Sequence, residues 1–123
     1  MINQIGQVML YVNDVLMCKD FWINDLGFIL IKDEMMGPIR AIEVAPKEMQ
    51  TSFVLMNKEI VQSMSPELDF GTPSIMFYAT NLEKLYEDFK QKGITVGELV
   101  TMPMGKVFNF SDPEGHYFAV LEK

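Results

Sequence analysis

Cysteine and histidine are almost missing from this sequence of 123 residues, which has one of each. The single Cys18 excludes an internal disulfide and fits a reducing compartment, so we expect a cytoplasmic protein with a buried, inert thiol. No apolar run approaches the roughly 18 residues that are needed to cross a bilayer. The first twelve residues contain no Lys or Arg, which argues against a secretory leader.

Positive charge is also scarce, with 10 basic residues against 17 acidic ones and a formal net charge of −7. An acidic surface repels the phosphates of nucleic acids and of anionic membranes, so we expect neither as a partner. A neutral or cationic ligand is a better match, and the alternative is that the charge serves solubility. Arg40, the only arginine, lies on a predicted strand, where an ion pair or solubility is favoured over recognition of an anion.

The sequence consists of two similar halves. Gln7 aligns with Ser74 at an offset of 67, and both runs, 7–13 and 74–80, alternate like strands. A helix should follow each strand, ending near Gly27 and Gly93, and three further strands are predicted in each half. These strands span residues 28–33, 39–45 and 52–56 in the first half, and 94–101, 106–110 and 116–122 in the second.

The pattern therefore predicts an α+β protein of two tandem β-α-β-β-β modules, forming a curved mixed sheet around a central cleft. We expect one domain over residues 1–123, with a first module at 1–56, a linker at 57–72 that can hold one short helical turn, and a second module at 73–123.

The paired modules, the Phe-Trp-Ile-Asn-Asp-Leu-Gly-Phe stretch at 21–28 and the Phe-Ser-Asp-Pro-Glu-Gly-His stretch at 110–116 resemble the vicinal oxygen chelate superfamily of glyoxalases, bleomycin-resistance proteins and extradiol dioxygenases. In its enzymes, four inward-facing side chains hold a divalent metal. The resemblance places those ligands on Gln7, Val54, Ser74 and Ala119. None is a good metal donor, so we expect no metal and no cofactor.

Strand parity predicts which side chains line the cleft. His116 has the opposite parity to Ala119 and follows the Asp-Pro-Glu-Gly turn, so a turn residue is favoured over a pocket contact or a general base. The predicted lining is rich in methionine and tyrosine and suits an apolar or aromatic ligand, unless these side chains simply fill a core. It comprises Gln7, Met9, Tyr11, Ser52, Val54, Met56, Ser74, Met76, Tyr78, Tyr117, Ala119 and Leu121.

Three functions remain open from the sequence. The first, which we prefer, is metal-independent binding of a small apolar or aromatic molecule. The second is a glyoxalase-like lyase or dioxygenase-type enzyme with a non-standard site or with a tyrosine (Tyr11, Tyr78 or Tyr117) as acid. The third is a regulatory module that has kept the fold without the chemistry. We also expect a homodimer, in which the modules pair within one chain or across two.

Overall fold

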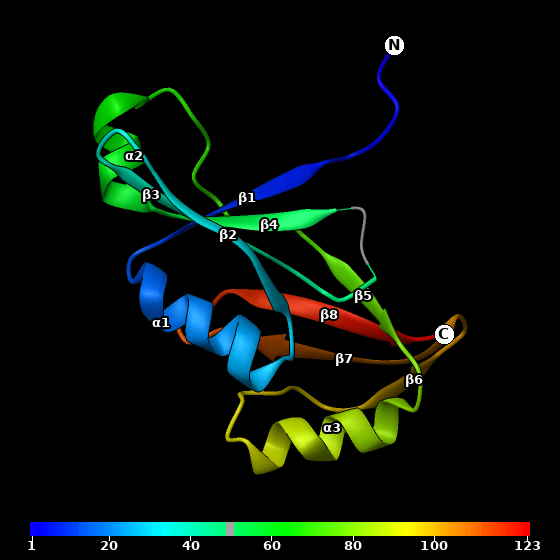
Figure 1. The fold of residues 1–123 in the computed structure, drawn as a ribbon. Coiled ribbons are helices and arrows are strands. Elements are labelled where there is room, and N and C mark those ends of the chain that lie inside the picture. The colour runs from blue at the N-terminus through cyan, green and yellow to red at the C-terminus, as the bar shows by residue number, and fades with distance from the viewer. Residues whose placement is uncertain (49–50) are drawn as a thin grey trace. The chain divides into compact units, whose positions relative to one another are not determined.

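The computed structural model describes residues 1–48 and 51–123, and the chain divides into two compact units, 1–72 and 73–123. Each unit contains one four-stranded mixed sheet and a helix that follows its first strand (Figure 1). The strand orders β1-β4-β3-β2 and β5-β8-β7-β6 are equivalent. The equivalence confirms the predicted α+β class and the tandem β-α-β-β-β pattern.

The elements follow the predicted order along the chain. The first unit consists of β1 (Gln7–Val12), α1 (Val15–Asp20), the π-helical turn η1 (Phe21–Asp25), β2 (Ile29–Met36), β3 (Ile39–Ala45), β4 (Ser52–Asn57) and α2 (Lys58–Met64). The second unit consists of β5 (Met76–Ala79), α3 (Leu82–Gln91), β6 (Val100–Met102), β7 (Gly105–Ser111) and β8 (Tyr117–Glu122). None of the described helices is long and apolar enough to cross a membrane.

One face of the first sheet is covered by α1 and η1, because their aromatic side chains bury against it. Trp22 is fully buried and packs against the rings of Phe21, Phe28 and Phe53 at centroid distances of 5.0–5.4 Å. Such aromatic contacts add to the large apolar area that each ring removes from water. The opposite face of this sheet is left for the side chains that line the candidate site.

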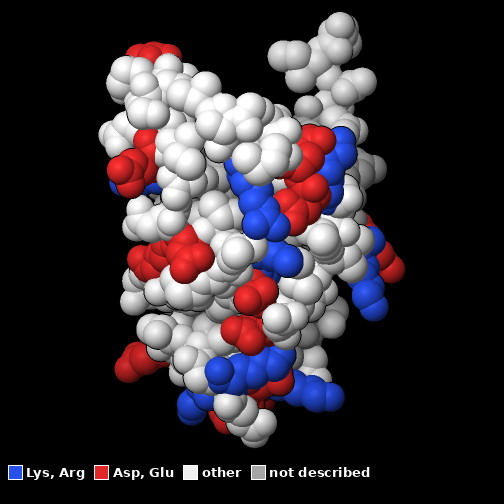
Figure 2. Space-filling view, turned by 60° about the vertical axis from the view of Figure 1, so that its left-hand side comes forward, with Lys and Arg blue, Asp and Glu red and all other residues white. Residues whose placement is uncertain are grey.

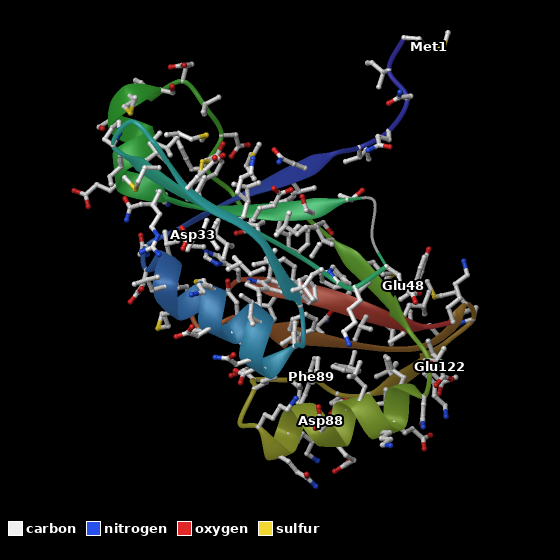
Figure 3. All side chains as sticks on the ribbon, in the orientation of Figure 1. Met1, Asp33, Glu48, Asp88, Phe89 and Glu122 are labelled. Carbon is white, nitrogen blue, oxygen red and sulfur yellow. The ribbon has the colours of Figure 1, made fainter. Side chains whose placement is uncertain are left out.

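The two main helices begin differently. At α1 the side chain of Asp14 accepts a hydrogen bond from the Met17 backbone N–H at 3.0 Å, as expected for an N-cap. At α3 the preceding Asn81 has φ of 51° and makes no side-chain cap. There the Leu82 N–H donates to Oε2 of Glu122 at 2.8 Å, so the end of β8 caps α3 (Figure 3).

Two predicted strands of the second unit were too long. Residues 94–101 give only the short β6 and one isolated bridge from Val96 to Phe110. Gly97 lies in this stretch, and its N–H donates to the Asn109 carbonyl at 2.8 Å. An interior glycine weakens a strand and allows such a single close approach. Similarly, β5 begins at Met76, so Ser74 lies outside the ladder that was expected to include it.

The predicted linker forms part of the first unit. Its helix α2 is capped by Asn57, whose side chain accepts a hydrogen bond from the Ile60 N–H at 2.9 Å. This confirms the short helical turn expected there. Figure 1 shows α2 at the end of the first sheet where β4 finishes, and the contacts of Val61 and Phe70 described below hold the segment against that sheet.

Candidate functional site

A hollow of about 200 Å³ lies on the face of the first sheet that α1 does not cover. Parallel pairing places Met9 beside Val54, and antiparallel pairing places Glu43 beside Val54 on the next strand. Paired residues project from the same face, so β1, β4, β3 and β2 all contribute to the lining. The lining residues are Gln7, Met9, Lys32, Glu34, Met36, Ala41, Glu43, Val54 and Met56.

The polar end of the hollow is built around the carboxylate of Glu43. Its Oε2 accepts hydrogen bonds from Nε2 of Gln7 at 3.2 Å and from Oγ of Ser52 at 2.5 Å. Ser52 is buried and opposite Gln7 in the β1–β4 register. Two donors on neighbouring strands therefore fix one oxygen of this carboxylate.

Ala41, Val54 and Met56 give the hollow an apolar part, and the segment after β4 packs against these three residues. Val61 of α2 forms a buried cluster with Ala41, Val54 and Met56, and Phe70 packs against that cluster. Tyr11, expected in the pocket lining, is also part of this packing. This face of the first sheet is thus filled with core at the α2 end and hollowed at the Gln7 end.

Charged side chains stand along the outer edge of the hollow on β2. Lys32 lies 3.8 Å from Glu34, and both side chains are about half exposed. An ion pair this open to solvent is weak. The acidic excess is not gathered into one patch on the face shown in Figure 2, where acidic and basic groups alternate among uncharged residues.

The predicted residues of the second unit share a face of the second sheet. Met76 lies beside Ala119 in the register of β5 and β8, and Tyr78 and Tyr117 have the same parity. The two tyrosines are 63% and 59% exposed, and the Lys123 ammonium lies 4.4 Å from the centre of the Tyr78 ring. Their contribution to a ligand pocket stays a prediction.

The sequence reasoning missed the lining residues of β2 and β3, above all Glu43. The alternation of residues 39–45 carried the signal, since Ala41 and Glu43 have the same parity and β3 pairs with β4 in the middle of the sheet. The lining of β2 was harder to assign, because a register shift between Leu30 and Lys32 changes the parity along that strand.

The described residues do not fit the metal site that the resemblance implies. Gln7 uses its amide to bind Glu43, while Val54 and Ala119 carry no donor atoms and Ser74 lies before β5. Within residues 1–48 and 51–123, no three His, Cys, Asp or Glu side chains gather as ligands for a metal ion. These four residues therefore lack the donor atoms and the arrangement that a divalent metal ion needs.

The remaining candidates have structural roles. Asp112 is buried, its Oδ1 accepts hydrogen bonds from the N–H groups of Glu114 and His116, and its Oδ2 lies 2.9 Å from Nδ1 of His116. The expected turn is confirmed.

Arg40 donates to both carboxylate oxygens of Asp33, at 3.0 and 2.7 Å, which lowers the pKa of Asp33 and raises that of Arg40. Of the two roles favoured for Arg40 from the sequence, solubility or an ion pair, the structure shows the ion pair.

Fold and sequence together define the family. The profile of the Glyoxalase/Bleomycin resistance protein/Dioxygenase superfamily matches residues 4–120, and the chain belongs to this family. Among its relatives is the uncharacterized protein YetH of Bacillus subtilis (strain 168), which is 35% identical over 99% of this chain and 100% of YetH. The uncharacterized protein YurT of the same strain is 28% identical over 93% of this chain and 94% of YurT.

Solved structures share the fold over nearly the whole chain. A superfamily member from Sphaerobacter thermophilus DSM 20745 is 26% identical, with a TM-score of 0.83 and coverage of 99% of this chain and 98% of that one. TnmS3, an antibiotic binding protein from Streptomyces sp. CB03234, is 23% identical, with a TM-score of 0.85 and coverage of 98% and 96%. The likeness to TnmS3 is a likeness of fold.

Proposed function

We propose that the chain binds a small, largely apolar molecule in the hollow of the first unit without the help of a metal ion. The observation that carries the proposal is the hollow itself, about 200 Å³ in volume and lined by three methionines, Met9, Met36 and Met56. Thioether side chains adapt to irregular apolar ligands, and a few placed polar groups orient them. An antibiotic binding protein, TnmS3, has this same fold.

A thermal-stability screen against aromatic antibiotics and metabolites tests the proposal. A ligand that binds only the folded protein stabilises it by about 2.7 kcal/mol at a concentration of about 100 times Kd. We expect at least one compound to raise the midpoint, and the increase to persist in the presence of a chelator. An increase abolished by the chelator would contradict metal independence, and no increase across a broad library would contradict ligand binding.

A matched pair of substitutions locates the ligand. Met9→Trp fills the hollow and should remove the increase in the midpoint, because Met9 lines it and is 39% exposed. Met35→Trp places the same ring on β2 at a residue that is 62% exposed and outside the hollow, and should keep the increase. Equal responses of the two variants would place the ligand elsewhere.

A further inference from the structure

The carboxylate of Glu43 has one oxygen committed to the protein and one available to a ligand. Both Gln7 and Ser52 donate to Oε2. Among the residues that the structure describes, Oε1 accepts no hydrogen bond. Glu43 lines the hollow and also the depression beside it that reaches Thr51, so this oxygen belongs to a group that faces open volume.

The hollow also carries unbalanced charge. Its lining includes two carboxylates, Glu34 and Glu43, and one ammonium, Lys32. Lys32 is opposite Glu43 in the β2–β3 register, yet the ion pair it makes is with Glu34. The groups bound to Glu43 are a neutral amide and a neutral hydroxyl. One negative charge is therefore left over, and a cationic group on a ligand would compensate it at close range.

The polarity of the lining changes along the strands. At one end lie Met36, Ala41 and Met56, with Glu34 opposite Ala41 on β2, where its carboxylate is paired with Lys32. At the other end lies Glu43 with its two donors. A ligand that fills the hollow along the strands meets mainly methionine and alanine surface at one end and the Glu43 carboxylate, which has no ion pair among the described residues, at the other, which favours a molecule with corresponding halves.

From these relationships we infer that the ligand class is a small amine, with an ammonium group that binds Oε1 of Glu43 and an apolar or aromatic body that packs against the methionines. The inference rests on the proposed function and adds the chemical class of the ligand. Glu43 is its specificity-determining residue, because a charged hydrogen bond in a partly enclosed site distinguishes an ammonium from a neutral or anionic group of equal size.

Three probes of nearly equal shape test the inference: 2-phenylethylamine, 2-phenylethanol and phenylacetate. Each is titrated into the full chain carrying ¹³C-labelled methionine methyl groups, and Kd is obtained from the shifts of Met9, Met36 and Met56. Met102 and Met104, exposed residues of the second unit, are the internal controls. We expect the amine to bind at least about ten-fold more tightly than the alcohol, and the carboxylate most weakly.

Two variants assign the preference to Glu43. Glu43→Gln should weaken binding of the amine about ten-fold and change binding of the alcohol less than about two-fold, which also shows that the hollow remains intact. Lys32→Gln removes the nearby cation and should strengthen binding of the amine. Glu59→Gln on α2 removes one negative charge outside the hollow and should leave all three Kd values unchanged.

The outcomes separate the two proposals. If the alcohol or phenylacetate binds as tightly as the amine, or if Glu43→Gln does not weaken the amine, the ligand class is wrong while binding in the hollow stands. If none of the probes shifts the three methionines, the ligand class is contradicted, and the proposed function is contradicted if the stability screen is also negative.

Discussion

The ring of Phe70 meets the ring of Tyr11 edge to face, with their centroids 4.9 Å apart. Phe70 belongs to the segment that follows β4, and Tyr11 to the first strand of the same unit. This contact, with that of Val61, packs the segment against Ala41 and Met56, which both line the hollow. A stretch that the sequence suggested as a linker therefore shapes the candidate site.

Phe70→Ala should loosen the packing of this segment. The ring is partly buried, so we expect the free energy of unfolding to fall by about 1–3 kcal/mol, less than the roughly 3–5 kcal/mol of a fully buried ring. Urea denaturation measures the loss, and hydrogen exchange at the Ser65 N–H, which donates to Val61 at 2.8 Å, should quicken. Leu68→Ala, at a residue that is 44% exposed, is the control and should have a small effect.

Ser52→Ala should destabilise the first sheet even though it removes a single oxygen atom. The hydroxyl is buried and donates to Glu43, so we expect a loss of about 1–2 kcal/mol in the free energy of unfolding. Chemical denaturation of this variant is compared with that of Ser63→Ala, at an exposed serine whose hydroxyl donates to the Ile60 carbonyl within α2, so the two variants differ in the burial of the lost hydrogen bond. An equal effect at both serines would show that the contact with Glu43 contributes little.

Arg40→Gln should raise the pKa of Asp33 towards its ordinary value of 3.8, because the lowering comes first from the hydrogen bonds of Arg40. In the wild type the folded-state pKa lies below the unfolded one. The stabilisation from this pair is therefore present above about pH 4 and is lost as the pH falls through the lowered pKa. Carboxyl ¹³C NMR measures the titration.

The pair of Glu83 and Lys106 supplies a control for that experiment within the same protein. Lys106 lowers the pKa of Glu83 by the same kind of contact in the second unit. Arg40→Gln should leave the titration of Glu83 unchanged, and Lys106→Gln should raise its pKa without moving that of Asp33. A shift of both carboxyl groups in either variant would indicate a general loss of structure.

Glu122→Ala should destabilise α3, because it removes the acceptor of the Leu82 N–H and a negative charge beside the helix N-terminus (Figure 3). We expect a loss of about 1–2 kcal/mol in the free energy of unfolding, and about half of that for Glu122→Gln, which keeps an acceptor oxygen. Thermal and urea denaturation compare both with Glu98→Ala, at an exposed residue. If Glu122→Ala has no larger effect than the control, Asn81 or solvent satisfies the helix end.

Periodicity and repetition made the fold accessible from the sequence. Alternation in residues 7–13 and 74–80 and the glycines at the helix ends are local signals, since each depends on neighbours within one strand or turn. Gly27 and Gly93 lie just beyond the helices, as predicted, and have positive φ of 78° and 77°, the conformation that glycine adopts at helix ends. Parity likewise placed Gln7, Met9, Val54 and Met56 on one face, where the structure has them around the hollow.

The tertiary structure decided the order of the strands in each sheet and the contacts between segments that lie far apart in the sequence. Glu43 lies at the candidate site because β3 is placed between β4 and β2. The cap of α3 comes from Glu122, which is 40 residues from Leu82 along the chain. Val61 and Phe70 pack against Ala41, Val54 and Met56, three residues that line the hollow, from a segment that follows the last strand of the sheet. Side-chain alternation specifies which residues share a face, whereas strand order and packing over that face arise from contacts that no local pattern encodes.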